Sequence, residues 1–124
     1  KVIEEYWPGE LTIIFKANEE FTEKFDSGLK TVGIRIPKNK TAIDIIKNTG
    51  GIVLTTSANI SGEKAVTDIK DMSEALLSEV DGIITDNSIL TGVPSTIIKY
   101  VEGEIELLRE GNINIEKIKQ LMKG

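Results

Sequence analysis

The sequence predicts an α/β fold in which strands of both directions form one mixed sheet. Short runs of β-branched and apolar residues recur along the chain, and polar stretches with helical spacing separate them. Strands and helices interleave without regular alternation, which favours a mixed sheet over a purely parallel one. A length of 124 residues with 40% hydrophobic content suits one domain with a real core. We therefore expect residues 1–124 to belong to a single domain.

The first third of the chain is expected to supply two strands. Residues 1–6 resemble the end of an element, and Trp7-Pro8-Gly9 then enforces a turn before a β-branched strand at 11–16. Residues 18–28 are polar without a clear period, as in a loop or short helix. Residues 31–36 alternate between two faces. One face carries Val32, Ile34 and Ile36, and the other carries Thr31, Gly33 and Arg35.

The middle of the chain is expected to supply two helices and two strands. Thr41 begins a helix with Asp44 three residues later, a pair similar to a capping box, and residues 48–51 end it. Residues 52–56 form a strand, and so do residues 83 and 84. Between them, residues 68–80 repeat the helical period with an inward face made of Met72, Ala75, Leu76 and Leu77.

The last third is expected to form a hairpin and a helix. Residues 97–101 and 105–109 are strands, and Glu102-Gly103 is the hairpin turn between them. Asn114 caps a final helix over residues 115–122, in which lysines lie toward the carboxyl end.

Composition excludes several kinds of chemistry. The chain has no cysteine and no histidine, which removes disulfides, thiolate nucleophiles, Ser-His-Asp triads and the commonest metal ligand. Its net charge of −5 argues against a protein that binds nucleic acid mainly through phosphate contacts. No apolar run is long enough to span a membrane, and no signal peptide opens the sequence, so we expect a cytoplasmic protein without membrane contact.

Small polar residues follow several of the predicted strands. The segment 55–62 follows an apolar run, and its hydroxyl and amide groups would lie at a sheet edge, where α/β proteins often bind ligands. The same residues also suit an ordinary turn. Arg35 and Arg109 are the only arginines in a lysine-rich chain, and arginine favours bidentate recognition of carboxylate or phosphate. A strand face with a solvated arginine remains the simpler interpretation of Arg35.

Known nucleotide motifs are absent. There is no Gly-x-x-x-x-Gly-Lys-Ser/Thr loop, and Gly50-Gly51 precedes a predicted strand where a phosphate-binding turn would precede a helix. Ser57 and Ser95 are therefore better interpreted as binding groups than as nucleophiles. Four aspartates could bind Mg²⁺, but caps and turns explain their positions equally well. They are Asp44, Asp68, Asp81 and Asp86.

Five segments together resemble the motifs of the YrdC-like family, the threonylcarbamoyl-AMP synthases, and they occur in the family's order over nearly the whole chain. They are Trp7-Pro8-Gly9 with Leu11-Thr12; Thr31-Val32-Gly33-Ile34-Arg35-Ile36-Pro37; Thr56-Ser57-Ala58-Asn59-Ile60-Ser61-Gly62; Gly92-Val93-Pro94-Ser95-Thr96-Ile97-Ile98; and Leu108-Arg109-Glu110-Gly111.

The resemblance implies a twisted open sheet with flanking helices and a concave, positively lined ligand cavity. It also implies an enzyme that makes threonylcarbamoyl-AMP and pyrophosphate from L-threonine, bicarbonate and ATP, for the threonylcarbamoyl modification of tRNA. No residue would act as a covalent catalyst; the protein would position substrates and neutralise charge, and Mg²⁺ would arrive with the nucleotide. The residues implied for L-threonine are Thr31, Arg35, Thr55 and Ser95, and those for ATP are Ser57, Asn59, the backbone near Ala65, and Arg109.

The sequence also departs from the family pattern. The family's Lys-Arg pair, which precedes a Pro-Leu and contacts the ATP phosphates, belongs upstream of Trp7 and is not in these residues. Glu110 stands where the family usually has proline, and the C-terminal extension of longer members is absent. We therefore expect an N-terminal segment to be missing, residues 1–124 to be the C-terminal portion of the domain, and this portion alone to synthesise little product.

Two alternatives stay open at this point. The chain could be a YrdC-type domain of another carbamoyl-transfer enzyme, such as the hydrogenase-maturation carbamoyltransferase, or a non-catalytic module that binds RNA or a partner protein. The acidic net charge disfavours RNA binding, while partner proteins in tRNA modification and direct tRNA contact are left open.

Overall fold

The computed structural model describes residues 1–25 and 28–124 of the chain. The chain divides into two compact units. The sheet unit consists of Lys1–Lys38 and Ser95–Gly124, and the second unit consists of Asn39–Pro94.

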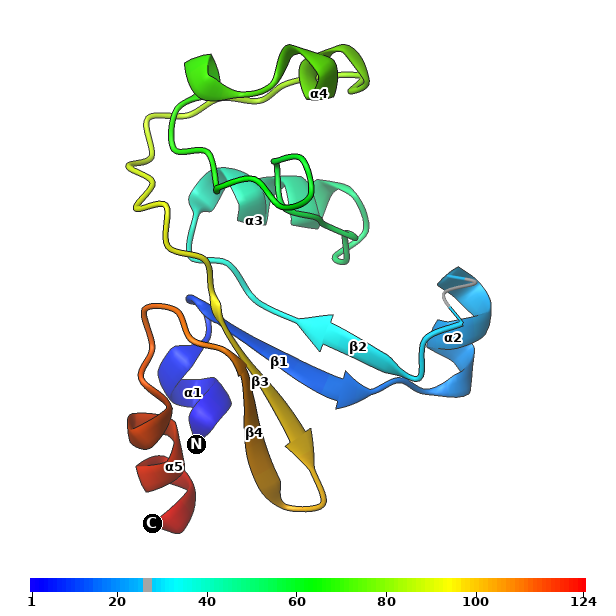
Figure 1. Ribbon diagram of the computed structural model, residues 1–124. Helices are drawn as coiled ribbons and strands as arrows, with labels where there is room; N and C mark the ends of the chain where they lie inside the picture. Colours follow the sequence, from blue (N-terminus) through cyan, green and yellow to red (C-terminus); the bar gives the residue numbers. More distant parts are fainter. Residues whose placement is uncertain (26–27) are drawn as a thin grey trace. The chain divides into compact units, whose positions relative to one another are not determined.

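Among the described residues of the sheet unit, four strands form one sheet in the order β2-β1-β3-β4 (Figure 1). They are β1 (Leu11–Lys16), β2 (Thr31–Ile34), β3 (Thr96–Val101) and β4 (Glu104–Arg109). β1 pairs parallel to β3, with Leu11 opposite Thr96, whereas β1 pairs antiparallel to β2, and β3 to β4. The predicted mixed sheet is therefore confirmed.

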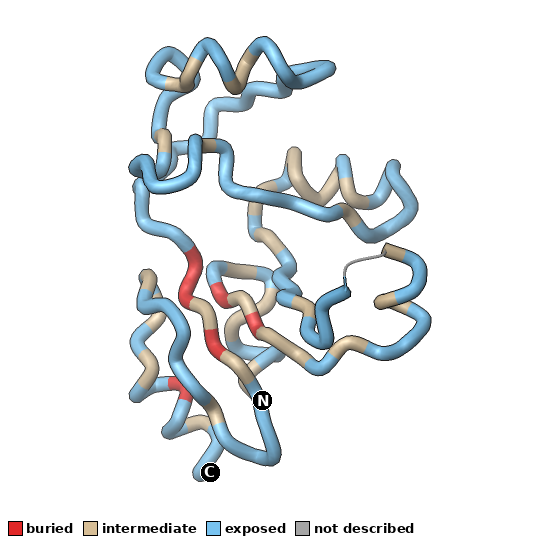
Figure 2. Tube along the Cα trace, turned by 45° about the vertical axis from the view of Figure 1, so that its right-hand side comes forward, coloured by how far each residue is buried: buried red, intermediate tan, exposed pale blue. Residues whose placement is uncertain are grey.

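The core lies on one face of this sheet, beneath two helices. Helix α1 (Val2–Tyr6) and helix α5 (Ile115–Lys123) contact each other and lie beside the strands in Figure 1. The buried apolar residues come from the two central strands and α5. They are Leu11, Ile13, Ile98 and Ile118. Figure 2 marks the buried positions of the chain, apolar and polar, in red. Burial of alternate residues on β1 and β3 leaves the other face of the sheet open to polar side chains.

Local signals explain the boundaries of several elements in the sheet unit. The Trp7 indole N–H donates to the Leu11 carbonyl at 2.7 Å, which fixes the turn before β1. Glu102 and Gly103 both have positive φ, 50° and 91°, as the two-residue turn of a β-hairpin requires. Asn114 caps α5 as predicted, because its side chain accepts a hydrogen bond from the Glu116 N–H at 2.7 Å.

The second strand is shorter than predicted. Its pairing with β1 ends at Ile34 rather than at Ile36, and one hydrogen bond from the Gly9 N–H to the Ile36 carbonyl, at 2.8 Å, continues the contact. The polar stretch before it contains a short helix, α2 (Glu19–Phe25), while residues 26 and 27 of the predicted loop or helix lie outside the described residues.

In the second unit, helix α3 (Lys40–Asn48) starts earlier than predicted. Its cap is Asn39, whose side chain accepts from the Ala42 N–H at 2.8 Å. Thr41 is therefore inside the helix, and Asp44 is bonded to the Lys40 ammonium one turn before it. The predicted Thr41 and Asp44 capping pair was wrong, because an asparagine two residues upstream satisfies the free N–H groups first.

The predicted helix at 68–80 is interrupted. A 3-10 helix, η1 (Ile69–Asp71), is followed by Met72, whose extended backbone separates it from helix α4 (Glu74–Ser78). Asp68 caps η1 by accepting from the Lys70 N–H at 2.9 Å. Ala75, predicted to face inward, is exposed, while the other three predicted inward residues are half-buried.

The strands predicted at 52–56 and at 83–84 are absent from the second unit, all of whose residues are described. Ile52 and Leu54 are 70% and 68% exposed, and Ile84 is 68% exposed. β-branched residues favour a pleated, half-buried surface, but a strand also needs a paired neighbour, and these segments have none within the described chain. None of the helices in the described ranges is long and apolar enough to cross a membrane.

Candidate functional site

A row of residues crosses the open face of the sheet, from the residue after β2 to the last residue of β4. Thr12 lies opposite Ile97, and Ile97 lies opposite Arg109. Ile13 pairs with Ile34 in the antiparallel pair of β1 and β2. Continuing this register by one residue sets Arg35, the residue after β2, opposite Thr12. The two arginines therefore end the row, with their backbones three strand spacings, or about 14 Å, apart. Arg35 and Arg109 thus lie at the same end of the strands, and this end of the sheet is called the arginine edge below.

Ser95 and Arg109 are directly bonded at this edge. The Arg109 Nε–H donates to the Ser95 carbonyl at 3.0 Å, and Arg109 Nη2 donates to the Ser95 hydroxyl at 3.1 Å. The Ser95 hydroxyl also shares a hydrogen bond of 2.8 Å with the Thr12 hydroxyl. Ser95 is only 7% exposed, whereas Arg109 is exposed, so the guanidinium is anchored at one side and open to solvent at the other.

The loop after Arg109 is fixed by a buried hydroxyl. Thr96 is fully buried, and its Oγ1 accepts from the Gly111 and Ile113 N–H groups, both at 3.0 Å, and donates to the Ile113 carbonyl at 2.9 Å. A hydroxyl has one donor and two acceptor sites, so the bonding capacity of Thr96 is filled. This side chain ties β3 to the segment that joins Arg109 to α5.

Arg35 has a different environment. Its side chain is exposed, and within the described part of the chain its guanidinium forms no hydrogen bond or ion pair. Thr31 lies on the same face but at the far end of β2, opposite Lys16, about 13 Å along the strand from Arg35. Arg35 therefore lies at the same end of the strands as Ser95 and Arg109. Thr31 lies at the opposite end of β2.

The other four predicted site residues lie in the second unit. Thr55, Ser57 and Ala65 are exposed. Asn59 is half-buried, and its side-chain nitrogen donates to the Ile60 carbonyl at 3.1 Å and the Glu63 carbonyl at 3.0 Å. The amide N–H groups of Asn59 thus brace the loop that contains them, and its side-chain oxygen is the atom left for a ligand.

Similarity to known proteins covers nearly the whole chain. The sequence profile of a family that groups Sua5, YciO and YrdC proteins, described as telomere recombination, matches residues 1–111. The chain therefore belongs to the Sua5/YciO/YrdC family. The family resemblance predicted from the five motifs is confirmed.

Relatives in this family have named activities. The chain is 31% identical over 117 residues to the threonylcarbamoyl-AMP synthase of Pyrococcus abyssi, and 30% identical over 122 residues to that of Bacillus subtilis. These matches cover 94% and 98% of the chain, but 34% and 35% of the relatives. The crystal structure of Pyrococcus abyssi Sua5 complexed with L-threonine matches 97% of the chain and 35% of that protein, with a TM-score of 0.84 and 30% identity. The chain thus spans about a third of the length of these relatives.

The contact of Thr12 with Ser95 was not predicted from the sequence. The sequence placed Thr12 in a family motif and on a strand, but nothing in the strand pattern distinguished a bonded threonine from a solvated one. Its partner is 83 residues away along the chain, so only the parallel pairing of β1 with β3 reveals the contact.

Three of the four aspartates considered for Mg²⁺, namely Asp44, Asp68 and Asp86, form hydrogen bonds within the described chain. The Lys40 ammonium lowers the pKa of Asp44. Hydrogen bonds from the Ser88 hydroxyl and the Asn39 amide, and from the Ser88 N–H, lower the pKa of Asp86 well below its usual range. Among the described residues, no group of three or more acidic side chains is placed to hold a metal ion.

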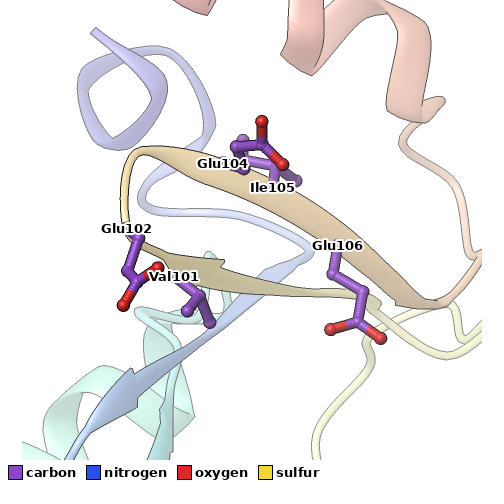
Figure 3. Close-up of a pocket in the computed structure, with 5 residues that line it drawn as sticks. All are labelled: Val101, Glu102, Glu104, Ile105 and Glu106. Carbon is purple, nitrogen blue, oxygen red and sulfur yellow. The ribbon is translucent and has the colours of Figure 1, made fainter.

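A hollow of about 360 Å³ at the β3–β4 hairpin contains none of the predicted site residues. Figure 3 shows its lining, in which Glu102, Glu104 and Glu106 accompany Val101 and Ile105. Three carboxylates disfavour an anionic nucleotide or an amino-acid carboxylate. The arginine edge, not this hollow, is therefore the candidate site of the sheet unit.

Proposed function

We propose that this chain forms part of the substrate site of a threonylcarbamoyl-AMP synthase, and that residues 1–124 act within one YrdC-like domain. The likeness of 97% of the chain to the L-threonine-bound Sua5 structure carries this proposal. The named activity of the Pyrococcus abyssi and Bacillus subtilis relatives supports it. Those names also favour this function over a different carbamoyl transfer or a purely RNA-binding role.

The two arginines would divide the anionic groups of the substrates between them. We assign Arg35, whose guanidinium has no partner in the described chain, to the carboxylate of L-threonine. We assign Arg109 to ATP, because its outer N–H groups remain open while Ser95 holds the inner ones. Within the sheet unit, further contacts to threonine would come from Thr31 and Ser95. For the second unit, we keep the roles that the family resemblance implies, which are Thr55 for threonine, and Ser57, Asn59 and the backbone near Ala65 for ATP.

The reaction would need no covalent enzyme intermediate. The amine of threonine attacks the carbon of CO2 derived from bicarbonate and loses a proton, which gives a carbamate. A carbamate oxygen then attacks the α-phosphorus of ATP, and the bond to the β-phosphate oxygen breaks to release pyrophosphate. This chain would orient the carboxylate and neutralise phosphate charge, which is how proteins accelerate such transfers.

Mg²⁺ would supply further charge neutralisation at the phosphates. The described residues include no acidic cluster that fits a resident metal, so we propose that the ion enters as the Mg²⁺ complex of ATP. The product would feed tRNA modification together with partner proteins, and we propose a cytoplasmic location for this step.

The test is L-threonine-dependent release of pyrophosphate, with mass-spectrometric detection of threonylcarbamoyl-AMP. It should be run on the 124-residue chain and on the longest natural protein that contains it. In the active form, Arg35→Gln should weaken L-threonine binding by about tenfold or more, the loss typical of a charge-assisted hydrogen bond. Lys117→Gln is the matched control, since it removes one exposed positive charge from α5.

Two results would contradict the proposal. One is an absence of threonine-dependent product from both proteins. The other is carbamoyl-group turnover from carbamoyl phosphate in place of threonine, bicarbonate and ATP, which would identify a different carbamoyl transfer.

A further inference from the structure

Thr12 stands at the start of a chain of hydrogen bonds that ends at Arg109. Its hydroxyl lies 2.8 Å from the Ser95 hydroxyl, which in turn accepts from Arg109 Nη2 at 3.1 Å. The Arg109 Nε–H donates to the carbonyl of the same serine at 3.0 Å. Ser95 therefore contacts the guanidinium through two atoms, and Thr12 contacts one of those two.

These bonds determine which N–H groups of Arg109 can meet a ligand. A guanidinium has five N–H donors in one plane. Ser95 occupies the Nε–H and one N–H of Nη2, so three donors remain on the outer side. Two anchoring bonds define the plane of the guanidinium, whereas the bond to the carbonyl alone would leave its terminal nitrogens less restrained.

Thr12 in turn determines the orientation of the Ser95 hydroxyl. That hydroxyl has one proton and two acceptor sites, and Arg109 fills one acceptor site. Thr12 takes either the proton or the other acceptor site, and in both cases it restrains rotation of the serine side chain. Because Ser95 is 7% exposed, water has little access to replace this bond.

The side chain of Thr12 is itself restrained. Threonine is β-branched and therefore stiff about its first side-chain torsion. Its methyl group faces Gly33 on the neighbouring strand, where an added Cβ would lie 3.5 Å away. The hydroxyl of Thr12 is thus held on the side of Ser95 by the packing of β1 against β2.

We propose that Thr12 is a positioning residue: through Ser95 it holds the Arg109 guanidinium in the orientation that receives the anionic nucleotide. The role rests on the proposed function for its substrate, but the positioning itself can be measured without substrate. Thr12 touches neither ligand in this proposal, and its effect is transmitted entirely through the Ser95 hydroxyl.

The first experiment uses NMR on the 124-residue chain. Arg35 and Arg109 are its only arginines, so the spectrum of the arginine Nε–H groups contains two signals. We expect the Arg109 signal to show slow exchange with water and restricted motion. The Arg35 signal should provide an internal mobile reference, because its guanidinium has no partner among the residues that the structure describes. Thr12→Val should make Arg109 exchange and move more like Arg35, while Thr12→Ser should keep it restrained. An unchanged Arg109 signal in Thr12→Val would overturn the proposal.

The second experiment measures synthesis in the active protein. Thr12→Val should raise the KM for ATP by about tenfold with a smaller change in kcat, the scale of one lost hydrogen bond to a charged group. Thr12→Ser should restore the KM to within about twofold of the wild type. Thr22→Val is the matched control, because Thr22 donates only to the Asn18 carbonyl on an exposed helix.

A double variant separates positioning from a general loss of stability. If Thr12 acts through Arg109, then Thr12→Val should have little additional effect in an Arg109→Lys background. Full additivity of the two substitutions, or failure of Thr12→Ser to restore the KM, would overturn the proposal. Absence of product from the wild-type protein would instead refute the proposed function, and the NMR experiment would still decide the role of Thr12.

Discussion

Thr96→Val should destabilise the sheet unit strongly although it changes almost no volume. The substitution replaces a fully buried hydroxyl by a methyl group and removes three hydrogen bonds, at 2.9 to 3.0 Å, to Gly111 and Ile113. Each bond contributes about 0.5–1.5 kcal/mol net, and buried groups left without a partner raise the cost, so the loss should be about 2–4 kcal/mol. The half-buried loop backbone can recover part of this loss by binding water.

The assay is urea unfolding followed by the fluorescence of Trp7, the only tryptophan, which packs against the core of the sheet unit. Thr96→Ser is the control, because it keeps the hydroxyl and removes one buried methyl group at a cost of about 1 kcal/mol. The Arg109 edge should also loosen in Thr96→Val, since the loop after it loses its anchor. A loss below about 1 kcal/mol, or one no larger than that of Thr96→Ser, would refute the assigned role of this hydroxyl.

Three further outcomes are expected. Asn114→Ala should cost about 1 kcal/mol in urea unfolding by removing the cap of α5, whereas Asn112→Ala, which breaks only an exposed bond to Glu10, should cost much less. Asn39→Ala should raise the pKa of Asp86 toward its ordinary value in an NMR titration of the carboxyl carbon. Because folding lowers that pKa, Asp86 stabilises the second unit above about pH 4 and loses this effect as pH falls through the folded-state pKa, so acid unfolding should be less steep in Asn39→Ala. Gly33→Val should weaken L-threonine binding by about tenfold with little loss of stability, because its side chain would cover the open face, approach the flexible end of Ile14 and make an ordinary contact with the Thr12 methyl group.

The sequence predicted the sheet unit well because local and long-range preferences agree there. Strand 11–16 alternates buried and half-buried residues and ends in a charged one, and the hairpin turn at Glu102-Gly103 can adopt the positive φ values that its geometry requires. Asn114 and the helix after it follow the ordinary capping rule. In each case a short segment contains the signal that determines its structure.

The sequence predicted the second unit less well, because a run of β-branched residues forms a strand only when another segment of the chain pairs with it. The runs at 52–56 and 83–84 have strand composition, yet a strand forms only when another strand supplies hydrogen bonds. No residue of Asn39–Pro94 is buried, so no core in this unit selects one face of these runs. The capping error at Thr41 has a local cause, since Asn39 and Thr41 both suit a cap and only the structure shows which side chain accepts the bond.

In the candidate site, too, some residues follow from local motifs, whereas one contact depends on the pairing of distant strands. Family motifs pointed to Ser95 and Arg109, but the bond between Thr12 and Ser95 depends on the register that sets Leu11 opposite Thr96. A shift of one residue in that register would turn the Thr12 or Ser95 side chain to the core face and separate the two hydroxyls. The buried residues on β1 and β3 prevent such a shift, because it would expose Ile13 or Ile98. The apolar core therefore determines the polar contact on the opposite face, and substitutions that loosen the core should disturb the Arg109 edge before the sheet unfolds.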